Sequence, residues 1–154
     1  MKEIINYVLI FLAGFLLCLA VVSLYNPIEF GSSDIEPEIL APGDWIHYNQ
    51  IQLNDNSLII NIENASISGY ADTNSMVPTL DSGANGIRIV PSDPEQINIG
   101  DIISFGEESI VHRVVDKGTD EEGIYFITKG DNNQYVDGKV RFEDIKYVTI
   151  GVLY

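Results

Sequence analysis

A serine, a histidine and two aspartates follow one another along this chain in an order that suits nucleophilic catalysis. They are Ser75, His112, Asp131 and Asp137. A serine hydroxyl becomes a nucleophile when a base takes its proton and donors receive the charge on the attacked carbonyl oxygen. A carboxylate can hold the imidazole in the tautomer that accepts this proton. The residue types therefore predict Ser-His-Asp acyl-transfer chemistry.

The neighbourhood of Ser75 predicts a loop that exposes its side chain. Residues 72–74 before it are polar, and Pro78 after it fixes one backbone torsion and restricts Val77. The pattern Ser-Met-x-Pro also fits an ordinary polar turn without chemistry. The histidine and the aspartates that follow favour a nucleophile over a simple turn.

His112 lies in an apolar segment, residues 110–115, that predicts a β-strand. Alternation along a strand places His112 on the same face as Ile110 and Val114. Partial desolvation between two β-branched neighbours favours the neutral imidazole that a general base needs. A structural histidine bonded to the backbone is the alternative. His47, in an earlier apolar run, matches no motif and is expected at the surface.

Two carboxylates and a lysine beyond the histidine are candidates for the remaining roles. Asp131 and Asp137 each lie in a sequence that could also form an ordinary turn, and the residues alone do not rank them. Lys129 could serve as the base of a Ser-Lys pair only if burial removed its charge. It is expected instead to be a surface residue at a strand end. Asp101, at the start of a predicted strand, is expected to be structural.

Three motifs together resemble those of signal peptidase I, in the archaeal and endoplasmic-reticulum branch where histidine replaces the bacterial catalytic lysine. They are Asn-Ser-Met-Val-Pro-Thr (74–79), Ile-Val-His-Arg-Val (110–114), and Lys-Gly-Asp-Asn-Asn (129–133) followed by Asp137. The resemblance covers roughly residues 70–152 and the apolar N-terminal segment. It implies a mainly β peptidase fold and cleavage of signal peptides.

The resemblance also assigns roles to six residues. It implies Ser75 as the nucleophile, His112 as the base, Asp137 as the triad acid and Asp131 as a supporting carboxylate. It implies that Thr73 and the backbone amide of Ser75 form the oxyanion hole. Met76 would help to shape the pocket for the residue before the cleaved bond.

The N-terminal segment 4–25 has no charged side chain and is long enough to cross a bilayer. About 22 residues at about 1.5 Å each reach roughly 33 Å, against a hydrocarbon core of about 30 Å. A cleavable signal peptide has a shorter apolar core. Lys2 precedes the segment and acidic residues follow it, so we expect a cytoplasmic N-terminus. Residues 1–25 are thus predicted to be a single-pass anchor in the cell membrane, with the remaining chain outside the cytoplasm.

The rest of the chain is expected to be a linker followed by one β-rich domain. Residues 26–44 carry prolines and clustered acids, which is typical of a linker. Residues 45–154 alternate between apolar runs and turn residues, with an extra hairpin at 45–62 and a peptidase core at 70–153. The expected fold is mainly β, a compact signal-peptidase-like β domain preceded by a single N-terminal transmembrane helix. The core strands are expected at 87–90, 101–105, 110–115, 124–128 and 146–153.

Composition excludes several other classes of function. The chain has 23 acidic and 8 basic residues and a net charge of −15, which argues against a basic nucleic-acid-binding surface. Its only cysteine, Cys18, lies in the predicted anchor, so no intrachain disulfide can form. No pair of Cys or His has metal-ligand spacing, and no glycine-rich phosphate loop is present. We therefore expect neither a metal nor another cofactor.

The residues predict a membrane-anchored serine endopeptidase, and the resemblance implies that it removes signal peptides from exported preproteins. Its expected partners are preprotein signal peptides and the lipid bilayer, and the sequence does not identify partners from the secretion machinery. Two alternatives stay open. One is a membrane-tethered protease of the same fold with a dedicated non-signal substrate, and the other is a catalytically inactive β binding module.

Overall fold

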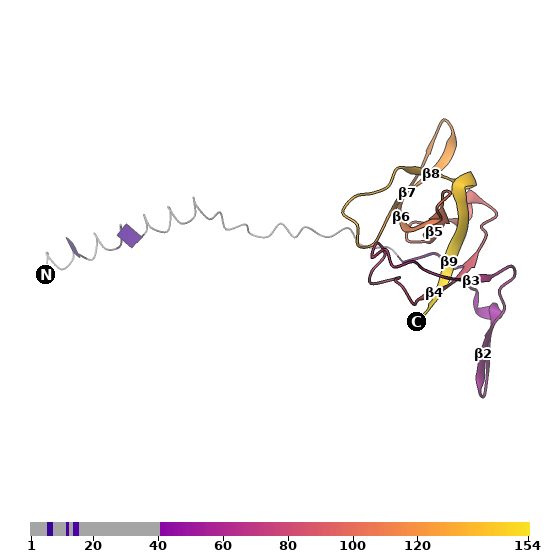
Figure 1. Ribbon diagram of the computed structural model, residues 1–154. Coiled ribbons are helices and arrows are strands. Elements are labelled where there is room, and N and C mark those ends of the chain that lie inside the picture. Colours follow the sequence, from indigo (N-terminus) through magenta and orange to yellow (C-terminus); the bar gives the residue numbers. More distant parts are fainter. Residues whose placement is uncertain (1–5, 8–11, 13, 16–40) are drawn as a thin grey trace. The chain divides into compact units, whose positions relative to one another are not determined.

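A computed structural model describes residues 6, 7, 12, 14, 15 and 41–154 of the chain (Figure 1). The chain divides into two units, Met1–Glu38 and Ile39–Tyr154. Most of the predicted anchor and linker lies outside the described residues. Among the residues that are described, no helix is long and apolar enough to cross a membrane.

The second unit is mainly β, as the sequence predicts. Its larger sheet is antiparallel, curls into a half-barrel and has the strand order β3-β4-β9-β5-β6-β7-β8 (Figure 1). The strands are β3 (Ser66–Gly69), β4 (Asn85–Ile89), β5 (Ile102–Phe105), β6 (Ile110–Asp120), β7 (Gly123–Lys129), β8 (Lys139–Arg141) and β9 (Ile145–Leu153). The C-terminal strand β9 lies between β4 and β5, so it joins segments that are distant in sequence.

The predicted extra hairpin is present as a separate two-stranded sheet of β1 (Ile51–Asn54) and β2 (Ser57–Ile60). Its strands are shorter than the apolar runs suggest. Residues Tyr48–Gln50 form a 3-10 helix instead, in which the Gln50 amide donates to the carbonyl of His47 at 2.9 Å. The Gln50 side chain also accepts the amide of His47 at 2.8 Å, so a local polar contact ends the strand pattern.

All five strands predicted for the core are present, with moderate differences in length. Strand β6 continues to Asp120 because a bulge after Val114 keeps it paired with β7. Strands β3 and β8 were not predicted, because they are short and alternate only weakly. Since β3 begins at Ser66, the large sheet starts earlier than the predicted core boundary at residue 70. Two further 3-10 turns, Pro94–Gln96 and Phe142–Asp144, connect strands.

Two apolar clusters fill the interior of the unit. The larger contains Ile97, Ile103, Phe105, Val114, Phe126, Val140, Ile145 and Val148. The smaller joins Met76 and Leu80 to Ile102 of β5, and all three side chains are buried. Burial of this kind is the main favourable contribution to folding. The smaller cluster therefore fixes the segment after Ser75 against the sheet.

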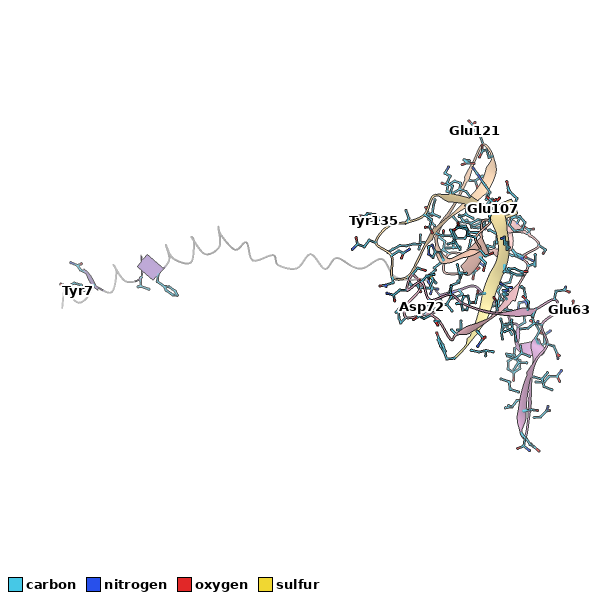
Figure 2. All side chains as sticks on the ribbon, in the orientation of Figure 1. Tyr7, Glu63, Asp72, Glu107, Glu121 and Tyr135 are labelled. Carbon is cyan, nitrogen blue, oxygen red and sulfur yellow. The ribbon has the colours of Figure 1, made fainter. Side chains whose placement is uncertain are left out.

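Charged groups lie mostly on the outside. Glu63, Asp72, Glu107 and Glu121 are exposed, and Figure 2 labels them on the ribbon. Asp101 is an exception, because it is completely buried. Its carboxylate accepts the backbone N–H groups of Gly43 and Asn98, both at 2.8 Å. These bonds satisfy the buried charge and give Asp101 the structural role that the sequence predicts.

Candidate active site

Ser75 lies in a loop that is held in place from both sides. Asn74 before it has φ of 62°, a left-handed conformation that asparagine tolerates better than most residues. The carbonyl of Ser75 accepts the N–H of Asn132 at 2.9 Å, and the Asn132 side chain donates to the carbonyl of Asn74 at 3.0 Å. A Cβ at Gly130 would lie 2.6 Å from the Ser75 carbonyl oxygen, so only glycine permits this approach. The loop at 130–133 thus positions the serine.

Two groups that can donate hydrogen bonds to an oxyanion lie beside the Ser75 hydroxyl. The Thr73 hydroxyl oxygen is 3.1 Å from Ser75 Oγ. Within residues 41–154 the backbone N–H of Ser75 donates to no acceptor, so it is available to a ligand. Fixed donors of this kind stabilise an oxyanion because they need no reorganisation during the reaction. Met76 is buried with Leu80 directly beneath this turn.

His112 on β6 is paired with Asp137. Its Nδ1 lies 2.6 Å from Asp137 Oδ2, and the imidazole is only 9% exposed. The same carboxylate oxygen accepts the Thr128 hydroxyl at 2.7 Å, while the Asp137 amide donates to the Thr128 carbonyl at 2.7 Å. With Nδ1–H donating to a carboxylate, the neutral ring presents its other nitrogen as a proton acceptor. The structure therefore places Asp137, not Asp131, on the imidazole.

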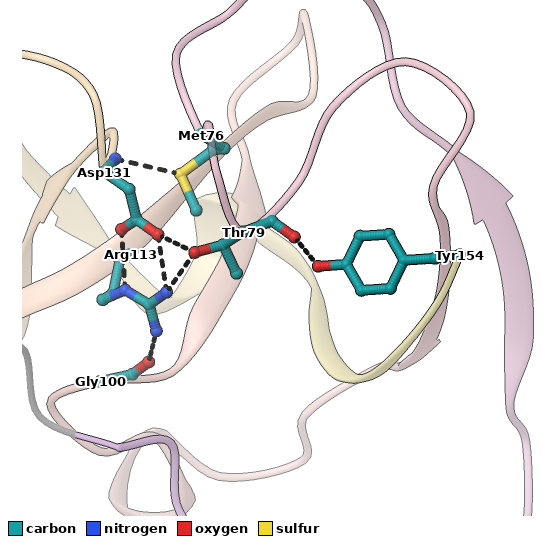
Figure 3. A network of polar contacts seen from close by, with 6 residues as sticks. All are labelled: Met76, Thr79, Gly100, Arg113, Asp131 and Tyr154. Carbon is teal, nitrogen blue, oxygen red and sulfur yellow. Dashed lines mark hydrogen bonds and ion pairs between the residues drawn. The ribbon is translucent and has the colours of Figure 1, made fainter.

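Asp131 has a different partner, Arg113, the next residue on β6. Arg113 Nε donates to Asp131 Oδ1 at 2.8 Å and an Nη donates to Oδ2 at 2.7 Å, so the pair is bidentate (Figure 3). The Thr79 hydroxyl donates to the same aspartate at 2.5 Å, and the other Nη of Arg113 donates to the Gly100 carbonyl at 2.8 Å. The two charged side chains are 8% and 6% exposed. This cluster joins the serine loop to β6.

The Asp131 cluster also sets the charge of its carboxylate. Burial would raise the pKa of Asp131, but the hydrogen bonds from Arg113 and Thr79 and the attraction of Arg113 outweigh it and hold that pKa below its ordinary value. The backbone N–H of Asp131 meets the Met76 sulfur at 3.4 Å, and the Tyr154 hydroxyl donates to the Thr79 carbonyl (Figure 3). Asp131 is thus an ionised anchor beneath the site.

Ser75 and His112 line one cavity of about 530 Å³. Thr73 and Met76 also line it, together with Tyr70 at the start of the serine segment. Four of the six predicted site residues therefore line this cavity. Of the other two, Asp137 contacts His112, and Asp131 contacts Met76 through its backbone N–H and pairs with Arg113.

Tyr70 closes part of this cavity. Its hydroxyl is 3.0 Å from Thr149 Oγ1, and a Cβ at Gly86 would lie 1.8 Å from the Tyr70 oxygen. Glycine at position 86 is therefore needed for the ring to lie across β4. Burial raises the pKa of Tyr70, so the phenol stays protonated and neutral at physiological pH.

Lys129 and His47 lie elsewhere. Lys129 ends β7, opposite Arg113 in the strand register, and does not line the cavity that contains Ser75. His47 is exposed, as predicted, and lines a separate cavity of about 480 Å³ beside Trp45. Among the residues that the structure describes, no three His, Cys, Asp or Glu side chains converge on a metal site.

Three residues at the site were given no chemical role from the sequence. Thr128 binds Asp137, while Arg113 and Thr79 bind Asp131. Arg113 directly follows His112 in one motif, and Thr128 directly precedes another. Their positions in or next to the motifs could have indicated that they contact site residues. Which aspartate each residue would contact depends on the fold of the loop between 129 and 138.

Comparison of the chain with models of protein families, with curated proteins and with solved structures found no match. A hydroxyl with adjacent donors and an imidazole held by a carboxylate open onto one cavity. This arrangement has the parts that acyl transfer requires: a nucleophile, a base with an orienting acid, and donors for an oxyanion.

Proposed function

We propose that this chain is a membrane-anchored serine endopeptidase that removes signal peptides from exported preproteins. The observation that carries the proposal is that Ser75 and the carboxylate-bound imidazole of His112 line the same cavity. The order of the three motifs supports the substrate class, since it resembles signal peptidase I. The uncharged segment 4–25 supports a membrane location with the catalytic unit outside the cytoplasm.

In the proposed reaction, Ser75 Oγ attacks the scissile carbonyl and the free ring nitrogen of His112 takes its proton. Asp137 stabilises the imidazolium that forms. The oxyanion accepts hydrogen bonds from the Thr73 hydroxyl and the Ser75 amide. The imidazolium then donates its proton to the leaving amine, and the acyl group stays on Ser75. A water molecule, deprotonated by His112, releases the signal peptide as a carboxylate.

The edge of the large sheet offers a way to hold an extended substrate. Within residues 41–154, strand β3 has one neighbouring strand, and its Ser68 and Gly69 line the cavity with Ser75. An extended peptide can pair its backbone with such an edge and place alternate side chains in pockets. Met76 and Leu80 line the same cavity and provide an apolar wall. We expect a small, uncharged residue before the cleaved bond.

The test is cleavage of a purified preprotein by the full chain in detergent micelles or liposomes. Ser75→Ala and His112→Ala should each abolish detectable cleavage, because nucleophile and base act as a unit. Lys129→Ala should cleave like the wild type, because Lys129 lies outside the cavity. Mass spectrometry of the products should locate the cut after a small residue at the end of the signal sequence.

The possible results separate the proposal from its rivals. A folded wild type that cleaves no preprotein in a varied panel contradicts signal-peptide removal. Cleavage of only one unrelated membrane substrate would indicate a dedicated protease. Cleavage that persists in Ser75→Ala would rule out serine chemistry at this site, whatever the substrate.

A further inference from the structure

Arg88, a residue with no assigned role, lines the same cavity as Ser75 and His112. It lies on β4, opposite Ser66 of the edge strand β3. Its Nε donates to the Ser66 hydroxyl at 3.1 Å, and its guanidinium carbon lies 3.9 Å from the centre of the Tyr147 ring. One hydrogen bond and one stacking contact thus fix the plane of the guanidinium. A group held in this way loses little conformational entropy when it binds a ligand.

The charge of Arg88 has no anionic partner in the described part of the chain. Four other cations of this unit pair with carboxylates, namely Arg113, Lys117, Lys139 and Arg141. Lys146 instead donates to the Glu107 carbonyl and the Ser109 hydroxyl, and it does not line the cavity. Arg88 uses only its Nε, and neither Nη group donates to an acceptor within residues 41–154. In a protein with a net charge of −15, this guanidinium remains unneutralised while facing a cavity. The half-buried side chain therefore has unused Nη donors and lines the cavity that Ser75 also lines.

We propose that Arg88 binds a carboxylate of the substrate and makes the site selective for peptides that carry one close to the cleaved bond. This inference rests on the proposed peptidase function. The planar guanidinium can donate two parallel hydrogen bonds to a carboxylate, which gives both strength and geometric selectivity. The carboxylate comes from an acidic side chain or from a peptide C-terminus, and both present the same two oxygens.

A second charged residue that lines the cavity should orient the bound peptide. Glu108, in the turn between β5 and β6, also lines the cavity and is exposed. A substrate carboxylate is attracted at Arg88 and repelled at Glu108. The acid-bearing part of the peptide should therefore lie toward β4, and uncharged or basic residues should lie toward the β5–β6 turn. The selectivity should weaken as salt concentration rises, because part of this interaction is open to solvent.

The experiment compares kcat/KM for a set of peptides that differ only in the position of one Glu or its isosteric Gln. The full chain in detergent should cleave the best Glu peptide at least about tenfold better than its Gln partner, as expected for a charge-assisted hydrogen bond. In Arg88→Gln this ratio should fall to about one. Arg88→Lys should give an intermediate ratio, because it keeps the charge and loses the bidentate geometry.

Matched controls separate this effect from folding and from total charge. Arg141→Gln removes one positive charge from the β8 side of the sheet, outside the cavity, and should keep the wild-type ratio. Glu108→Gln should reduce the difference in kcat/KM between Glu and Gln peptides whose acidic residue lies toward the β5–β6 turn. Peptides with an amidated C-terminus show whether the bound carboxylate is a side chain or the chain end. Thermal unfolding of each variant verifies that it is folded.

Failure of this inference differs from failure of the proposed function. Equal cleavage of all Glu and Gln pairs by the wild type would overturn the role of Arg88 and leave the peptidase intact. If no peptide is cleaved, binding of the same pairs to the Ser75→Ala protein gives the answer by fluorescence anisotropy. Carboxylate recognition is supported if Ser75→Ala binds the Glu peptide more tightly than the Gln peptide and the double variant Ser75→Ala/Arg88→Gln does not. Equal dissociation constants for both peptides contradict it.

Discussion

Two consecutive residues of β6 form two base–carboxylate pairs that differ in what they can do. Neighbouring side chains on a strand point to opposite faces. His112 pairs with Asp137 beside the cavity, and Arg113 pairs with Asp131 behind the serine loop. The two aspartates come from one short segment, 131–137. Strand β6 and the 131–137 loop thus form two sites, and each consists of one basic side chain and one aspartate.

The two pairs differ in how exposed the aspartate is and in whether its partner can exchange a proton. Asp137 is 30% exposed and its partner is an imidazole, whose ring nitrogens can act as proton donor and acceptor. Asp131 is 6% exposed and its partner guanidinium always carries its charge. The first pair can therefore take part in proton transfer, while the second is a permanent ion pair that fixes the loop. The two pairs are chemically similar, but only His112 of the first pair lines the cavity, whereas Arg113 of the second does not.

The largest effect should come from Asp137→Asn. The amide can no longer stabilise an imidazolium and favours the wrong tautomer, so cleavage should fall by about 10³- to 10⁴-fold. Stability should change little, because the Asp137 side chain is partly exposed. Kinetics on a preprotein and urea unfolding of the same sample measure both quantities. A large loss of stability with retained activity would show that Asp137 has the structural role here assigned to Asp131.

The next effect, on stability, should come from Arg113→Met. It leaves the Asp131 carboxylate buried without its partner, and losing one member of a buried pair costs about 3–5 kcal/mol. Urea unfolding gives this change in the free energy of unfolding. Combining it with Asp131→Leu removes the unpaired charge and should restore much of the loss. A double variant no more stable than Arg113→Met would mean that packing of the Arg113 stem, not charge, determines the effect.

The sequence could predict His112 and the two aspartates but not the role of Arg113. Only the resemblance, not the residue types, implied that Asp137 is the partner of His112. The motifs identify Ser75, His112 and two aspartates because residue type and order carry that information. The fold class is predicted because the apolar runs alternate and turn residues separate them. The partners of Asp131 and Asp137 could not be ranked, since both are followed by turn residues and only the path of the loop places one beside His112. Arg88 gave no signal because its sequence neighbours are ordinary strand residues.

A smaller effect should appear in the pH dependence of stability. The pKa of Asp131 is lower in the folded protein than its ordinary value of about 3.8. Its ion pair therefore stabilises the fold above that value, and this stabilisation disappears as pH falls through the folded pKa. The difference in unfolding free energy between wild type and Asp131→Asn should be largest near pH 6–7 and shrink below about pH 4. A difference that stays constant down to pH 2 would contradict an ionised Asp131.

The smallest effects should come from the two threonines, one on each aspartate. Thr128 donates to Asp137 and Thr79 donates to Asp131. Thr128→Val removes a bond to a charged acceptor that orients the imidazole, so cleavage should fall by roughly tenfold. Thr79→Val removes the corresponding bond on the other pair, and we expect a loss of about 1–2 kcal/mol in unfolding free energy instead.

Each threonine variant is the control for the other, because both replace a hydroxyl by a methyl group of nearly the same size. Measuring kcat/KM and urea unfolding for both gives four numbers. The expected pattern is crossed: Thr128→Val lowers activity more than stability, and Thr79→Val lowers stability more than activity. If both variants lost activity in proportion to stability, the two pairs would act as one rigid unit. Since both aspartates lie in one loop, only this crossed pattern demonstrates that proton transfer and loop anchoring are separate tasks.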